Sequence, residues 1–293
     1  MVALGDMSTA PVVLALIGFL IIAALEYFKV KGGILLGIVA TWLLGIVAQL
    51  TGWYVPDAAA GLNSVIPDMT WEGIKANFAA PAMFNFDFGF ILENTVSFAI
   101  VIFTFLYADI FDTVGTLIGV AQKADLLDEN GELPNASGAL MADAVGTVVG
   151  ACMGVPTVTS YVESTAGAAA GGRTGLTSFT TATLFLIAII FAPIFLAIPS
   201  FATTPALMYV GLLMLSAVKK IDFTSDIADS VGAFLAIIMM PFAYSIATGI
   251  MFAVLAWVIL KVVTGKIKDI SVIMWVTFVL FAIYMILKAM GLA

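Results

Sequence analysis

Two carboxylates in this chain occupy positions that a lipid environment normally excludes. Asp112 lies inside the apolar run 98–120, and Glu163 follows Gly154-Val-Pro-Thr-Val-Thr-Ser-Tyr161, which interrupts the apolar pattern. An ionisable side chain at bilayer depth costs about 2.5–3.5 kcal/mol on insertion scales, so it is by default a candidate functional residue. One acid on a helix and a second acid after a helix break are typical of the binding site of a membrane carrier.

Further polar side chains accompany Asp112. Asp109, Asp112 and Thr116 are spaced i, i+3 and i+7, so they share one face of a helix. Asp109 is the member that fits a structural role best, such as a cap or a bond to a neighbouring helix. Asp143 lies in a second apolar run, 141–147, where it is either a third site residue or, as we favour, a buried hydrogen-bond partner. Asp112, Asp109 and Asp143 are the candidates for carrying a proton.

The segment around Glu163 predicts a change of secondary structure. Residues 155–160 contain β-branched side chains at alternate positions, which favours a short extended strand. Ser160-Tyr-Val-Glu163 fits a capping box, in which Glu163 would bond back to the start of a half-helix, 161–172. A helix that begins at mid-membrane presents free N–H groups and the positive end of its dipole to a small ligand.

The composition indicates a polytopic, all-α membrane protein. Hydrophobic residues make up 62% of the 293 residues, charged residues only 10%, and the mean hydropathy is +1.16; soluble domains carry about 25% charged residues. The net charge of −8 does not indicate a nucleic-acid partner. No His is present and Cys152 is the only cysteine, so proton chemistry must rest on carboxylates, and we predict no metal, cofactor or internal disulfide.

Apolar runs define the expected membrane spans. About 20 residues are needed to cross a bilayer, and runs of that order lie at 11–28, 34–53, 97–119, 176–197 and 270–290. Shorter runs lie at 139–153, 161–172, 204–218, 231–247 and 249–264. Whether 270–290 spans the membrane or lies in its interface is left open by the pattern.

The cations predict the sidedness of these spans. If each run crosses once, and 154–172 crosses as one unit, nine of the eleven Lys and Arg residues fall on one side, leaving Lys75 and Lys288. The excess of cations marks the cytoplasmic face. The connection 57–96 then lies outside; its aromatic residues are either a lid or, as we favour, interfacial anchors. We therefore expect a multi-pass protein of the plasma (inner) membrane.

Four motifs carry a resemblance to a known family. They are Phe111-Asp-Thr-Val-Gly-Thr-Leu-Ile-Gly119, Leu140-Met-Ala-Asp-Ala-Val-Gly-Thr147, Thr157-Val-Thr-Ser-Tyr-Val-Glu-Ser164 and Ala170-Gly-Gly-Arg-Thr-Gly-Leu176. Together they resemble the adenine/guanine/hypoxanthine permeases of the nucleobase–ascorbate transporter superfamily. The resemblance implies two inverted repeats of seven helices, with the substrate held between two half-strands.

By that resemblance the chain is the C-terminal part of the 7+7 fold and lacks the first five helices. Residues 1–56 would be gate helices of the first repeat and 57–96 the outer connection. Residues 97–200 would be core helices of the second repeat with the site, and 201–293 its gate helices with a C-terminal helix. The implied substrate-binding residues are Glu163, Asp112, Thr116, Val162, Ser164 and Thr159. The family usually has an acid where Thr248 stands here.

The resemblance implies secondary active import of purine bases with protons. The chain would then require the missing N-terminal segment, and a homodimer is a candidate assembly. Three alternatives stay open: a carrier of the same fold for uracil, xanthine or an anion, a non-transporting fragment, and an intramembrane enzyme. The enzyme is disfavoured because the chain has no His and no nucleophile motif. An anion carrier would favour a cation near the break, and none lies between Lys123 and Arg173.

Overall fold

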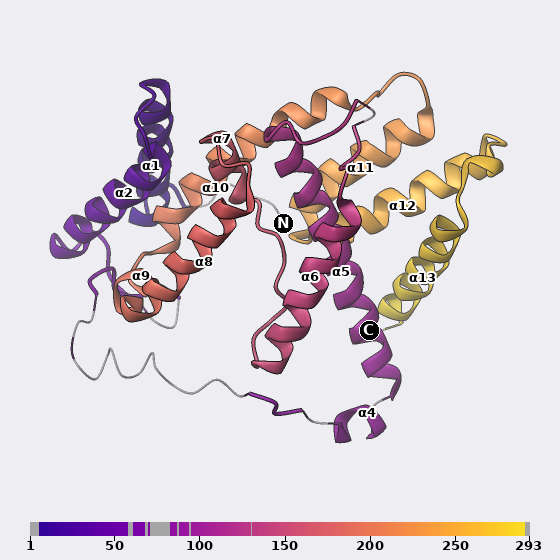
Figure 1. The fold of residues 1–293 in the computed structure, drawn as a ribbon, viewed down its shortest axis with the longest axis horizontal. Helices are drawn as coiled ribbons and strands as arrows, with labels where there is room; N and C mark the ends of the chain where they lie inside the picture. The colour runs from indigo at the N-terminus through magenta and orange to yellow at the C-terminus, as the bar shows by residue number, and fades with distance from the viewer. Residues whose placement is uncertain are drawn as a thin grey trace.

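The computed structural model describes residues 6–57, 61–67, 70, 83–86, 88–93, 95–129 and 131–290. These residues form helices joined by short turns, and no β-strand occurs among them (Figure 1). Five helices are long and apolar enough to cross a membrane: α1 (Ala10–Tyr27), α2 (Gly33–Leu50), Val101–Lys123 within α5 (Thr95–Lys123), α12 (Ile246–Val263) and α13 (Val272–Ala289). An all-α polytopic membrane protein is thereby confirmed, and α13 is one uninterrupted helix of spanning length.

The remaining helices are shorter. They are α4 (Gly89–Glu93), α6 (Ala136–Cys152), α7 (Ser164–Ala169), α8 (Gly175–Ile190), α9 (Ala192–Leu196), α10 (Ser200–Met214) and α11 (Ile227–Ala243). Two short 3-10 helices, η2 (Leu215–Lys220) and η3 (Ile267–Asp269), follow α10 and α12. The predicted single span 176–197 is instead two helices that meet at Phe191. Pro193 lies in the first turn of the second helix, α9, and it has no N–H group with which to continue the hydrogen bonds of α8.

Helices α1, α2 and α10 pack together at one end of the molecule (Figure 1). Their shared apolar core includes Leu14, Ala48 and Phe201, all nearly inaccessible to solvent. The helices approach closely at Gly18, where an added Cβ would overlap Thr41 Oγ1 and lie 2.9 Å from Pro205 Cγ. Small residues permit such close contact between helices in lipid, where no hydrophobic force drives them together.

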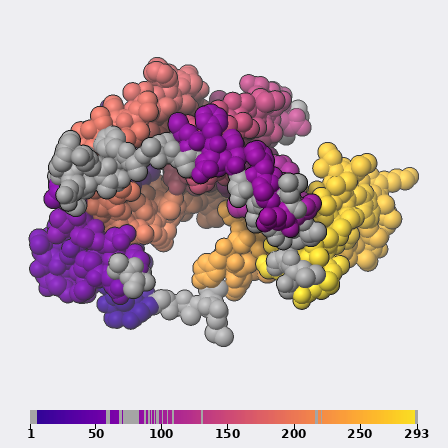
Figure 2. Space-filling model, turned by 90° about the horizontal axis from the view of Figure 1, so that it is seen from below, coloured from indigo at the N-terminus to yellow at the C-terminus, as the bar shows by residue number. Residues whose placement is uncertain are grey.

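Helices α5, α12 and α13 form a second apolar core. Tyr107, Val258 and Phe281 are among its buried residues. The segment α10–η2 connects the first group of helices to the second through α11, which pairs with α12 as a helical hairpin. The hairpin turns at Tyr244, whose left-handed φ of 49° ends α11, and at Ser245, whose side chain caps α12 by accepting from Thr248 N. Seen from below, the chain curves around an open space (Figure 2).

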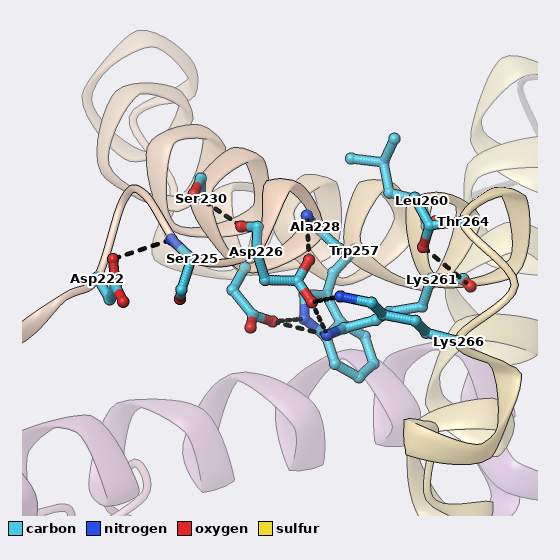
Figure 3. A network of polar contacts seen from close by, with 11 residues as sticks. Asp222, Ser225, Asp226, Ala228, Ser230, Trp257, Leu260, Lys261, Thr264 and Lys266 are labelled. Atoms are coloured by element: carbon cyan, nitrogen blue, oxygen red, sulfur yellow. Dashed lines mark hydrogen bonds and ion pairs between the residues drawn. The ribbon is translucent and has the colours of Figure 1, made fainter.

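The far end of the α11–α12 hairpin is joined by charged side chains (Figure 3). Asp226 caps α11 by accepting from Ala228 N at 2.8 Å, and its Oδ2 lies 2.7 Å from Lys261 Nζ and 2.9 Å from Lys266 Nζ. Lys261 also approaches Asp229 Oδ1 at 3.4 Å. The two ammonium groups lower the pKa of Asp226 well below its ordinary value. This network joins the start of one helix to the end of the next.

The segment between α6 and α7 differs from the sequence prediction. Residues 155–160 follow an irregular path, and α7 covers Ser164–Ala169 instead of 161–172. Glu163 is the residue before the helix, with no side-chain cap bond, so the capping box predicted from Ser160 is wrong. The helix begins later because residues 161–166 first form a turn, in which Ser164 N and Thr165 N bond the carbonyls three residues back.

Candidate functional site

Helix α5 carries the central acid of the candidate site. It continues without a break through Asp109, Asp112 and Thr116, as the apolar run predicts. Thr113 and Thr116 are buried, with 1% and 3% of their surfaces exposed, whereas Asp112 is half-buried. Because lipid cannot satisfy polar groups, these side chains must find partners inside the protein.

The first partner is on α6. Thr113 Oγ1 donates to Asp143 Oδ2 at 3.0 Å and thereby connects α5 to α6. Asp143 and Thr147 are four residues apart, so they lie on the same face of α6. Asp143 thus has the hydrogen-bond partner that its position in an apolar run requires.

The same face of α6 holds the irregular segment. Thr147 Oγ1 donates to Val158 O at 3.0 Å and lies 3.2 Å from Val158 N, so one hydroxyl serves both backbone groups of that residue. The Val158 side chain packs over Gly146 and Gly150, where an added Cβ would approach it within 3.4 Å and 3.0 Å. An unpaired backbone group away from water is costly. Thr147 therefore supplies to Val158 the hydrogen bonds that a neighbouring strand would otherwise make.

The irregular segment in turn reaches Asp112. Thr159 Oγ1 lies 3.5 Å from Asp112 Oδ2, 47 positions away in the chain, and 3.4 Å from the carbonyl oxygen of Ser160, so its one hydroxyl hydrogen can donate to either. Two residues that the family resemblance assigned to one site are therefore neighbours in space. Thr159 is half-buried, and its hydroxyl borders the carboxylate of Asp112 from outside α5.

Glu163 and its neighbours are arranged differently. Glu163 and Ser164 are exposed and Val162 is half-buried. No described residue forms a hydrogen bond or an ion pair with the Glu163 carboxylate, so the structure does not join it to Asp112 by a direct contact. Helix α7 packs on α5, and Thr165 on α7 is completely buried. The Thr165 Oγ1 atom has no hydrogen-bond partner within the described residues.

Asp109 occupies the same region as the other acids. Its Oδ1 atom is buried and has no partner among the residues that the structure describes. The negative charges of Asp143 and Asp112 act on it. Three carboxylates, two on α5 and one on α6, are thus close enough to act on one another electrostatically.

Three residues of this site escaped the sequence analysis as site members. Thr113, Thr147 and Thr165 each bring a hydroxyl to the α5–α6–α7 contact. Thr147 was detectable, because it follows Asp143 by one helical turn inside an apolar run. Thr165 has no such signal, because it is distinguished only by the helix that covers it.

Arg173 contacts the chain directly after the end of α5. The Arg173 guanidinium donates to the carbonyl of Ala124, directly after α5, and lies 3.4 Å from Asp125. The last carbonyls of a helix have no partner within it, and a cation there is favourable. Arg173 is therefore a cation at the end of α5, and it ties the residues after α7 to that helix.

Comparison with known proteins identifies the family of this arrangement. The sequence profile described as the permease family matches residues 1–252. The chain belongs to this permease family. It is 38% identical to a putative permease of Methanocaldococcus jannaschii over 97% of the chain and 61% of that protein. It is 37% identical to the adenine permease AdeQ of Escherichia coli over 98% of the chain and 60% of the relative.

A third relative extends the range of named substrates. The guanine/hypoxanthine permease PbuG of Bacillus subtilis is 38% identical over 98% of this chain and 61% of the relative. The chain thus spans about three fifths of the length of the curated relatives it matches. Membership of the permease family, together with the spanning helices, makes the chain a multi-pass membrane protein. In bacteria this means the plasma membrane. The chain is a member of a transporter family instead of an enzyme family.

Proposed function

We propose that this permease-family chain acts in secondary active transport of purine nucleobases together with protons. The observation that carries the proposal is the Thr159–Asp112 contact, because it brings the helix break to the membrane acid at 3.5 Å. Relatives named for adenine and for guanine and hypoxanthine supply the substrate class. The domain boundaries at 56, 96 and 200 are part of this proposal.

Recognition of the base would use both sides of the break. A purine offers ring N–H donors and nitrogen or oxygen acceptors, so a carboxylate and a hydroxyl are suitable partners. The exposed carboxylate of Glu163 would accept from ring N–H groups, because no protein donor occupies it among the described residues. Val162 and Ser164 would add backbone and hydroxyl contacts, with Thr116 and Thr159 bordering the Asp112 side.

Proton coupling would use the three carboxylates on α5 and α6. Asp112, Asp109 and Asp143 influence one another electrostatically, so protonating one of them lowers the repulsion within the group. One elementary charge moving through the membrane potential supplies about 2.3 kcal/mol per 100 mV, enough for tens-fold accumulation of a neutral base. Asp112 is the proposed carrier of that proton because it borders the break through Thr159.

The proposal includes a partner strand for residues 155–160. These residues are irregular here, and Thr147 serves the backbone of Val158. A strand is stabilised by backbone bonds to a neighbour, and the inverted-repeat fold would supply one from the first repeat. We therefore expect the segment to straighten when such a half-strand is present.

Uptake of labelled bases in transporter-deficient cells tests the proposal. The cells would express the 293-residue chain alone, or the chain with the N-terminal segment of AdeQ, each with Glu163→Gln and with Glu132→Gln as an exposed-loop control. We expect the cells to take up adenine, guanine or hypoxanthine. Glu163→Gln should abolish this uptake, whereas the Glu132→Gln control should leave it unchanged. Uptake of uracil alone, or purine uptake unaffected by Glu163→Gln, would contradict the proposal.

A further inference from the structure

A cavity lies away from the acids, between α5, the α11–α12 turn and α13. It encloses about 200 Å³ and is bordered by Phe103, Tyr107, Thr248, Met251 and Phe281, with Lys288 at its edge. Pockets for drug-sized ligands measure roughly 300–1,000 Å³, so this cavity suits a molecule of one or two rings. It is not used in the mechanism proposed for transport.

A buried hydroxyl without a partner marks this cavity as a binding site. Tyr107 is 8% exposed, it lines the cavity, and its hydroxyl has no hydrogen-bond partner among the described residues. A buried polar atom without a partner lowers the stability of the protein, so an occupant that accepts a hydrogen bond from it is favoured. Buried polar groups in native proteins are otherwise nearly always paired.

The other polar groups of the cavity are also able to donate. Ser245 Oγ accepts from Thr248 N at 3.1 Å and from Thr248 Oγ1 at 3.0 Å, which leaves the Ser245 hydroxyl hydrogen to donate. Lys288 Nζ lies 5.9 Å from the centre of the Tyr284 ring, and no described carboxylate forms an ion pair with it. The cavity thus presents Tyr107, Ser245 and Lys288 as donors, which favours a ligand with exposed acceptor oxygens.

The walls of the cavity favour a planar ring. The ring centres of Tyr107 and Phe281 lie 4.2 Å apart in an edge-to-face arrangement, and Phe103 lies 6.1 Å from Tyr107 and 6.0 Å from Phe281. Aromatic side chains bind flat ligands through stacking and edge contacts. An extended acyl chain would not use the three donors, because it has no acceptor along its length.

The cavity faces away from Asp112. Phe103, Tyr107 and Phe111 repeat at four-residue spacing and pack toward α12 and α13. Asp112 follows Tyr107 by five residues, which is about 7.5 Å along the helix and about 140° around it. Asp112 contacts Thr159, on the side of α5 that faces the break. One helix therefore separates the two locations.

We propose that this cavity is a second binding site, for a small planar heteroaromatic molecule that carries ring carbonyl oxygens. The oxopurines hypoxanthine and guanine belong to this class, and naming them rests on the proposed function. Tyr107 donates to the ring carbonyl, the rings of Phe103 and Phe281 flank the base, and Lys288 favours acceptor oxygens at the edge. Adenine, which has no ring carbonyl, binds here more weakly.

Equilibrium binding of labelled hypoxanthine and adenine to the purified 293-residue chain in detergent tests this proposal. The measurement is made on the wild type and in a Glu163→Gln background, which removes the proposed transport site. Tyr107→Phe is added to that background, with Tyr27→Phe as a matched control because Tyr27 is 81% exposed. The melting temperature of each variant shows whether it is folded.

We expect saturable hypoxanthine binding that survives Glu163→Gln and weakens about five- to tenfold with Tyr107→Phe. Tyr107→Phe also reduces the preference for hypoxanthine over adenine, which a purely structural effect would not do. Absence of saturable binding in the Glu163→Gln background, or binding indifferent to Tyr107→Phe, overturns the second site. Binding that weakens with Tyr107→Phe and is unchanged by Glu163→Gln supports the second site, whereas the proposed transport site is tested separately by the uptake of labelled bases.

Discussion

Thr113 on α5 and Asp143 on α6 are joined by a hydrogen bond of 3.0 Å between Oγ1 and Oδ2. The two residues are 30 positions apart, and Thr113 is 1% exposed. This bond fixes the helix that carries Asp112 against the helix that holds the irregular segment through Thr147. This partly buried contact therefore helps to hold the two halves of the candidate site together.

Replacing Thr113 with Val is expected to weaken the α5–α6 contact. The substitution keeps the shape and removes the donor, so the Asp143 carboxylate loses its partner, at a cost of about 1–3 kcal/mol. Thermal unfolding of the purified protein in detergent measures the loss. Thr204→Val is the control, because Thr204 is exposed and its hydroxyl bonds only within its own helix. Equal effects of the two substitutions would contradict the assignment.

Acid is expected to loosen the α11–α12 hairpin. The pKa of Asp226 is lowered by Lys261 and Lys266, so its contribution to stability is complete above the ordinary Asp pKa of about 3.9. It is lost as the pH falls below that value toward the lowered folded-state pKa. Asp226→Asn should therefore lower the melting temperature at pH 7 and reduce its decline on acidification. A variant that melts like the wild type at pH 7 would show that the network adds nothing.

Gly249 is expected to tolerate no side chain. A Cβ there would overlap the Met240 side chain and lie 2.9 Å from Met240 N and 3.2 Å from Ala236 O, which are backbone atoms of α11. Gly249→Ala should cost about 1–3 kcal/mol because the two helices must separate. Gly211→Ala is the matched control, since nothing lies within 4 Å of its Cβ position, and it should be neutral or slightly stabilising. Denaturant unfolding distinguishes the two.

Arg173 is expected to matter through Ala124 more than through Asp125. Its ion pair with Asp125 is exposed, with 44% and 82% of the two side chains accessible, and such pairs contribute about 0–1 kcal/mol. Its bond to the Ala124 carbonyl satisfies a group at the end of α5. Hydrogen exchange in α7 should therefore quicken in Arg173→Gln and change little in Asp125→Asn. A larger effect of Asp125→Asn would reverse this ranking.

Local pattern was enough to predict the long helices and to single out the candidate acids, but not the division of 176–197 into α8 and α9. The run 97–119 became part of α5, and 249–264 became α12, because apolar residues in lipid must satisfy their backbone within the segment. The expense of a charge in such a run singled out Asp112 without any structure. The prediction failed around Ser160 and Glu163, where the spacing fits a capping box but a turn at 161–166 comes first and the helix begins at Ser164.

The sequence by itself determined that this is an all-helical membrane protein with an acid on α5 and a break before α7. Both follow from hydropathy and backbone preference, which act over one or two helical turns. Only the tertiary structure decided that Thr113 binds Asp143, that Thr159 reaches Asp112, and that Asp226 pairs with Lys261. Contacts between residues 30 to 47 positions apart depend on how helices pack, and hydropathy does not specify that packing.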